Sequence, residues 1–158
     1  MLFEGTPLFE YARRLVSFKG REPSIFKDVF NRRDVKELII YLNTEDQIIA
    51  EGVDTEGNII GVYSPATELI TNGRKKAGEP FDLYDTGAFI ESFRVDVDSG
   101  EFTITSNPIK VDPVEGPVNI YDKFNNFKIE GLTDENMRVL IDYVRNYYID
   151  DYKARFIR

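Results

Sequence analysis

The stretch RVDVDSGEFTITS, residues 94–106, decides the fold class. Apolar side chains alternate with polar ones on both sides of Ser99-Gly100, at Val95, Val97, Phe102 and Ile104. A period of two residues is typical of strands that bury one face and expose the other, and Ser-Gly is a turn signal. We therefore predict an antiparallel hairpin here.

Downstream, GLTDENMRVLIDYVRNYYIDDYKARF (131–156) predicts a long C-terminal helix. Thr133 stands where an N-cap is expected and acidic residues follow it, as the helix dipole favours. Apolar residues recur at helical spacing at Met137, Leu140, Ile141, Val144, Tyr147 and Tyr148.

Upstream, the pattern predicts three helices. The first runs from Thr6-Pro7 to Gly20, the second begins at Pro23-Ser24, and the third has Asp34 as its cap. The second and third carry apolar faces at helical spacing, including Ile25, Val29, Val35, Leu38 and Ile39.

Residues 43–68 predict a turn followed by a second hairpin. Thr44 and Gln47 have the spacing of a capping box, and Thr55-Glu56-Gly57-Asn58 is expected to turn the chain between two short strands. The segment 107–119 holds three of the seven prolines, which indicates an irregular connection suited to contact a partner.

The predicted fold class is α+β: a small antiparallel sheet of two hairpins packed against helices, with a long C-terminal helix. We divide the chain into an N-terminal helical arm, residues 1–36, and a single α+β domain, residues 37–158. The arm has a formal charge of +3 and the rest of the chain −11, so a basic arm could dock on an acidic neighbour.

Composition excludes several chemistries. The 158 residues contain no cysteine and no histidine, so thiol nucleophiles, Ser-His catalysis, and thiolate or imidazole metal sites are absent. The net charge of −8 argues against nucleic acid as the main ligand. No apolar run approaches the roughly 20 residues of a membrane span.

Asp85-Thr86-Gly87-Ala88 permits two interpretations. Many retroviral-type aspartic proteases have this sequence at their catalytic turn. A chain this short would have to dimerise to bring two carboxylates together. The downstream partner element would be Ile129-Glu130-Gly131, where Glu130 puts a charge in place of an aliphatic side chain. The residues after the turn suit a helix, so we favour a structural turn in which Asp85 is the N-cap.

The order of motifs resembles a family of virion proteins from tailed phages of Bacteroidetes, including crAss-like phages. The motifs are YLNTEDQIIAEGVDTEGNIIGVYSPAT, a Lys- and Gly-containing loop, LYDTGAFIESFRV, the acidic hairpin and IEGLTDEN. The chain is also distantly similar to tail-completion and virion-morphogenesis proteins. Their signature before a hairpin is apolar-x-(x)-Thr-Gly-x-Leu-x-x-Ser, and the corresponding residues here are Leu83, Thr86, Gly87, Phe89 and Ser92. The resemblance covers roughly residues 40–140.

This resemblance implies a structural subunit of the phage neck or tail, a connector, adaptor or tail-completion ring between portal and tail. It implies a homo-oligomeric ring that contacts other neck, portal or tail proteins, with no enzymatic activity, no cofactor, and at most non-specific proximity to genomic DNA. The expected location is the virion, after assembly in the host cytoplasm. The alternative is a dimeric aspartic protease that uses Asp85.

Overall fold

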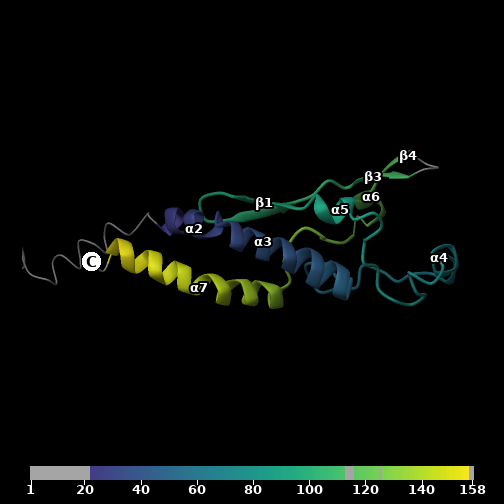
Figure 1. Ribbon diagram of the computed structural model, residues 1–158, viewed down its shortest axis with the longest axis horizontal. Helices are drawn as coiled ribbons and strands as arrows, with labels where there is room; N and C mark the ends of the chain where they lie inside the picture. Colours follow the sequence, from purple (N-terminus) through teal and green to yellow (C-terminus); the bar gives the residue numbers. More distant parts are fainter. Residues whose placement is uncertain (1–21, 113–115, 125, 157–158) are drawn as a thin grey trace, which may run out of the picture.

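The computed structural model describes residues 22–112, 116–124 and 126–156. The elements follow in chain order, in the numbering of Figure 1: α2 (Glu22–Phe30), α3 (Arg33–Tyr41), η1 (Leu42–Glu51), α4 (Pro65–Ile70), α5 (Ala88–Glu91), β1 (Arg94–Val97), β2 (Phe102–Thr105), β3 (Ile109–Asp112), β4 (Gly116–Asn119), α6 (Ile120–Lys123) and α7 (Asp134–Phe156). The predicted α+β class is confirmed, including the long C-terminal helix.

Three layers form the body of the molecule (Figure 1). The helices α2, α3 and η1 follow one another along the middle layer, α7 packs on one side of α2 and α3, and strand β1 packs on the other side of α3. We call these elements, together with Phe93 and strand β2, which pairs with β1, the slab. Its interior is apolar and includes Ile25, Val35, Ile39, Phe93, Ile104 and Leu140.

The hairpin at residues 94–106 is confirmed. Strands β1 and β2 are antiparallel, with Val95 opposite Ile104 and Val97 opposite Phe102. Val95 and Ile104 are buried, and their neighbours Asp96 and Thr103 are exposed. The alternation in the sequence therefore corresponds to one wet and one dry face.

The second sheet comes from a different segment than expected. Residues 53–68 turn at Asp54–Asn58, but the returning chain makes only isolated bridges, Val53 with Ile59 and Val62 with Pro80. Ser64 then caps α4, because its Oγ accepts a hydrogen bond from the Thr67 N–H at 3.1 Å.

The irregular connection predicted for residues 107–119 is instead an antiparallel ribbon of β3 and β4, with Val111 opposite Pro117. A strand of a two-stranded ribbon has one unpaired side, so it can hold a proline without losing a ladder hydrogen bond. Counting prolines as loop formers was therefore misleading here.

The capping box predicted at Thr44 and Gln47 is wrong, because the helix continues through these residues as the π-helix η1. The Thr44 hydroxyl donates back to the Ile40 carbonyl at 2.8 Å. The amides of Asn43 and Gln47 are buried and bind the backbone at residues 129–133. A π-helix is rare, and here it accompanies two buried amides that hold a distant segment.

The division of the chain into an arm and a domain at residue 36 stays a prediction. A boundary at residue 36 would cut through α3, and α2 supplies Ile25, Val29 and Phe30 to the core. The helix predicted between Thr6-Pro7 and Gly20 lies outside the described residues. Asp34 does not cap α3, since Arg32 is the N-cap and makes no side-chain cap bond.

Asp34 instead joins α3 to α7. Its carboxylate accepts hydrogen bonds from the hydroxyls of Tyr143 at 3.1 Å and Tyr147 at 2.9 Å, and from the Arg32 guanidinium at 3.2 Å. Partial desolvation alone would raise the pKa of Asp34, but these hydrogen bonds outweigh it and lower the pKa below 3.8. A side-chain hydrogen bond with Tyr147, followed by the bond to Asp34, raises the pKa of Tyr143 to about 12.

Candidate functional site

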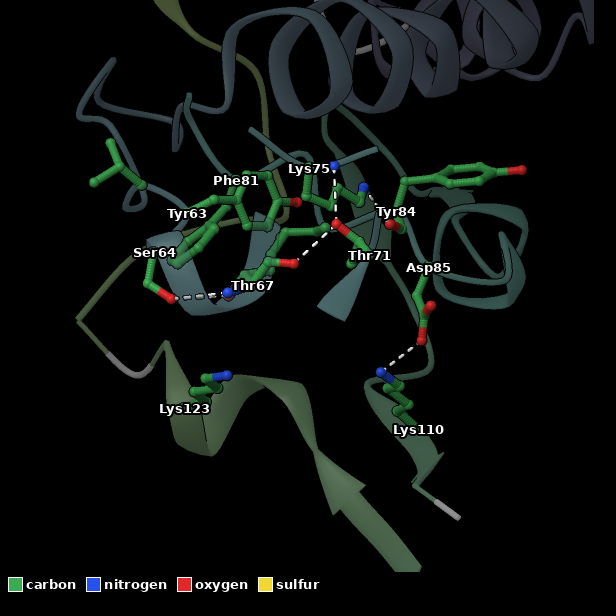
Figure 2. Close-up of a pocket in the computed structure, with 12 residues that line it drawn as sticks. Tyr63, Ser64, Thr67, Thr71, Lys75, Phe81, Tyr84, Asp85, Lys110 and Lys123 are labelled. Carbon is green, nitrogen blue, oxygen red and sulfur yellow. Dashed lines mark hydrogen bonds and ion pairs between the residues drawn. The ribbon is translucent and has the colours of Figure 1, made fainter. Parts of the chain in front are cut away.

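A cleft lies between two segments that project from the slab. One is residues 61–87, which carry α4 and which we call the α4 lobe; the other is the β3–β4 ribbon, followed by α6 (Figure 1). Three adjoining hollows of about 370, 680 and 350 Å³ form the cleft, and Leu83, Asp85 and Lys110 line all three. Figure 2 shows the first hollow, with α4 on one wall and Lys110 and Lys123 on the other.

The predicted turn residues Asp85, Thr86 and Gly87 lie on the wall of this cleft. Asp85 is not the cap of α5, because the N-cap position is Gly87 and no side chain caps the helix. Gly87 has φ 89°, which a residue with a Cβ rarely adopts. The Thr86 hydroxyl accepts a long hydrogen bond of 3.4 Å from the Ala88 N–H.

Asp85 instead forms an ion pair across the cleft. Its Oδ2 lies 2.6 Å from Nζ of Lys110 on β3, and 62% of the Asp85 side chain is exposed. A pair this exposed contributes little to stability. Its effect is to connect the α4 lobe with the ribbon, as the dashed line in Figure 2 shows.

In the basic segment 71–80, the Lys75 ammonium is held by several polar contacts. Lys75 pairs with Asp82 and donates to the Tyr84 carbonyl at 2.6 Å. The Tyr63 hydroxyl donates to Asp82 Oδ1 at 2.6 Å, and the Tyr84 N–H donates to the same oxygen at 2.8 Å. These contacts fix the base of the α4 lobe.

Burial and charge act in opposite directions in this network. Desolvation opposes ionisation of both Lys75 and Asp82, but their mutual hydrogen bond and attraction outweigh it. The pKa of Lys75 is therefore raised, and that of Asp82 is lowered. Tyr63 has a raised pKa because it is partly buried and next to the Asp82 carboxylate.

Lys123 on α6 is the second lysine of the cleft wall. Its ammonium lies 5.8 Å from the Phe124 ring centroid and contacts no carboxylate among the described residues. The cleft floor beside it is apolar, with Leu83, Val118 and Ile120. This wall therefore combines an unneutralised cation with apolar area.

Large apolar side chains are exposed on the two projecting segments. Leu69 and Ile70 at the end of α4 are 79% and 80% exposed, and Val111 on the ribbon is 74% exposed. Neither α4 nor the ribbon packs extensively on another described element. An exposed apolar group of this kind marks an interaction site more often than chance does.

Thr133 lies outside the cleft, at the start of α7. Its hydroxyl accepts a hydrogen bond of 3.3 Å from the Asn136 N–H, the geometry of an N-cap. The predicted cap is therefore confirmed at Thr133. At Asp85 the predicted cap is wrong, because that side chain pairs with Lys110 instead.

Sequence reasoning missed the residues that complete the cleft: Tyr63, Asp82, Lys110 and Lys123. No local pattern identifies them, because Asp85 and Lys110 lie 25 positions apart and meet only through the turn of the ribbon. A lysine between two apolar residues of one strand, Ile109-Lys110-Val111, was the available signal.

In the part of the chain that the structure describes, no three acidic side chains converge closely enough to hold a metal ion. Within the same residues, no helix has the length and apolar character to cross a membrane. The cleft is lined by apolar area, hydroxyls, the Asp85 carboxylate and three lysines. Lys75 pairs with Asp82 and Lys110 with Asp85, so Lys123 is the lysine that can attract a surface that is apolar and acidic.

Comparison of the chain with protein-family models, with curated proteins and with solved structures finds no match.

Proposed function

We propose that this protein is a structural subunit of a tailed-phage neck or tail, a connector, adaptor or tail-completion ring between portal and tail. The order of motifs in residues 40–140 supports the phage assignment. The observation that carries the structural role is the pair of projecting segments, whose exposed apolar side chains Leu69, Ile70 and Val111 have no cover in the described chain.

An assembly subunit explains this exposure. A two-stranded ribbon with four-residue strands is marginally stable by itself, and uncovered leucine, isoleucine and valine side chains favour association. A ring of identical copies, joined to neighbouring portal and tail proteins, would cover both segments. Its place is the virion, after assembly in the host cytoplasm, with at most non-specific proximity to DNA and no cofactor.

The alternative, a dimeric aspartic protease, fits the site less well. Such an enzyme needs two Asp carboxylates that share one proton and hold a water. Asp85 is instead paired with the Lys110 ammonium. Gly131 of the downstream element is hydrogen bonded to the amides of Asn43 and Gln47. We therefore propose a role without catalysis.

The test is the location of the chain in a particle. Tailed particles of the phage that encodes the chain are purified and analysed by mass spectrometry. They are also labelled with gold-conjugated antibodies against the protein. We expect several copies per particle at the junction of head and tail. Absence from purified particles would refute the proposal, and peptide cleavage that Asp85→Asn abolishes would favour the protease.

A further inference from the structure

A ring of identical subunits needs two different surfaces that fit each other, since each copy contacts its neighbours head to tail. The cleft offers one such surface: an apolar floor with Lys123 on its wall, beside the Lys110–Asp85 ion pair. A complementary surface must be convex, partly apolar and acidic. It must also lie away from the cleft on the same chain.

One face of α7 has these properties. Residues three or four apart on a helix form a continuous stripe, and one such stripe combines exposed apolar, amide and acidic side chains: Glu135, Val139, Asp142, Tyr143, Asn146 and Asp150. We call it the acidic stripe. Its charged members are acids, and the exposed Arg138 and Arg145 lie along one side of it. Val139 is 46% exposed, and the Tyr143 ring is 41% exposed.

The acids of the stripe are only partly neutralised. Asp142 pairs with Arg145 at 2.6 Å. No ion pair joins Glu135 or Asp150 to a cation among the described residues. The stripe therefore presents acidic charge beside apolar area, and the cleft presents lysine charge beside apolar area.

From this complementarity we propose that the cleft of one copy binds the acidic stripe on α7 of a second copy. The proposal rests on the ring assembly proposed above and names its contact. It uses the familiar arrangement of a helix laid in an apolar groove. The apolar side chains supply the buried area, and Lys123 facing an acid such as Asp150 selects the orientation.

The unlike surfaces make the contact directional. A cleft cannot bind a cleft, so each copy engages one neighbour through its cleft and another through α7. Such a contact continues from copy to copy and closes when the rotation permits. The α4 lobe and the ribbon would flank the bound helix, which would cover the exposed Val111 side chain on the wall of the second hollow.

Charge reversal in the full-length chain tests this contact. Lys123→Glu changes the cleft, Asp150→Lys changes the stripe, and sedimentation velocity measures self-association. We expect each variant to associate about tenfold more weakly than the unchanged chain, because like charges then face each other. An equimolar mixture of the two variants should recover association, since its contacts pair either Lys123 with Asp150 or the two reversed charges.

Matched controls separate this contact from a general charge effect. Lys27→Glu on α2 and Glu101→Lys near the β1–β2 turn change exposed charges outside both surfaces by the same amount. We expect both to associate like the unchanged chain, and all four variants to keep its circular dichroism spectrum and unfolding midpoint.

Three results would overturn the proposal. If Glu101→Lys weakens association and Asp150→Lys does not, the acidic hairpin turn is the occupant. If the mixture of Lys123→Glu and Asp150→Lys stays dissociated, the two surfaces do not meet. A chain that is monomeric at every soluble concentration also refutes self-docking, whereas its place in the virion is decided separately by labelling of particles.

Discussion

The slab and the two projecting segments differ in how they hold their shape. In the slab, α2, α3 and α7 bury aliphatic and aromatic side chains such as Ile25, Ile39 and Leu140. The α4 lobe and the ribbon have no fully buried apolar side chain; Phe81 and Leu83 of the lobe pack partly buried against the core. Backbone bridges and polar contacts such as Lys75–Asp82 add to this packing. Mutations in the slab should therefore alter folding, and mutations in the projecting segments should alter association.

The largest effect is expected from the centre of the slab. Phe93 is 1% exposed and packs edge-on against Phe89, with ring centroids 5.2 Å apart. Phe93→Ala should lower the free energy of unfolding by about 3–5 kcal/mol, because it removes a buried ring and leaves a cavity. Denaturant unfolding measures this loss.

The matched variant is Ile70→Ala, which truncates the 80%-exposed side chain at the end of α4. We expect its free energy of unfolding to stay within about 0.5 kcal/mol of the parent value. A large loss at Ile70, or a small one at Phe93, would contradict the division between slab and projecting segments.

The second-largest effect on stability is expected from Gln47, whose buried side-chain amide holds the backbone at residues 131–133. The Gln47 side chain donates to the Gly131 carbonyl at 3.2 Å and accepts from the Thr133 N–H at 2.9 Å. Gln47→Ala leaves both backbone groups without this partner and should cost about 2–3 kcal/mol in unfolding free energy. Glu45→Ala, an exposed position of the same helix, serves as control, and a similar cost there would show that the helix itself was damaged.

Asp82 provides a pH-dependent comparison within the α4 lobe. At neutral pH, Asp82→Asn should destabilise the protein by about 1 kcal/mol, because the carboxylate loses its bonds to Lys75 and Tyr63. The pKa of Asp82 is lowered below 3.8 in the folded state. Its contribution is therefore present above pH 3.8 and is lost as the pH falls through the lowered value.

Unfolding free energies of the parent and of Asp82→Asn should accordingly converge only below pH 3.8. Glu79→Gln is the control, since Glu79 is exposed and makes only a loose 3.8 Å contact with Lys76. If the difference in unfolding free energy between the parent and Asp82→Asn were the same at pH 3 and pH 7, the charge of Asp82 would contribute nothing to stability.

The smallest effect should come from Asp85. An ion pair with a 62%-exposed carboxylate is worth less than about 0.5 kcal/mol, so Asp85→Ala should barely change unfolding, and Asp85→Ser should behave like it. At Thr133 the same pair of changes should differ: Thr133→Ala costs about 1 kcal/mol, and Thr133→Ser restores most of it. A rescue by serine at Asp85 would return that residue to the role of cap.

Elements with a strong local pattern were predictable from the sequence. The β1–β2 hairpin and α7 follow from period and capping, since both are set by neighbouring residues. The π-helix was not predictable, because Asn43 and Gln47 acquire their partners from residues 129–133. The cleft was missed for the same reason. The residues next to Asp85 suggested a helix cap, and its partner Lys110 lies in a ribbon that the prolines of residues 107–119 made look like a loop.

The ribbon's proline has a further consequence for solubility. Bare strand edges invite other chains to pair with them, which leads to aggregation. In β4 the second residue is Pro117, which has no N–H to offer an incoming strand. On the β3 side, the Ile109 N–H already donates to Asn107 Oδ1 at 3.1 Å, so this edge is also partly occupied. A strand that arrives at either edge therefore finds an interrupted template, which disfavours the growth of stacks of ribbons.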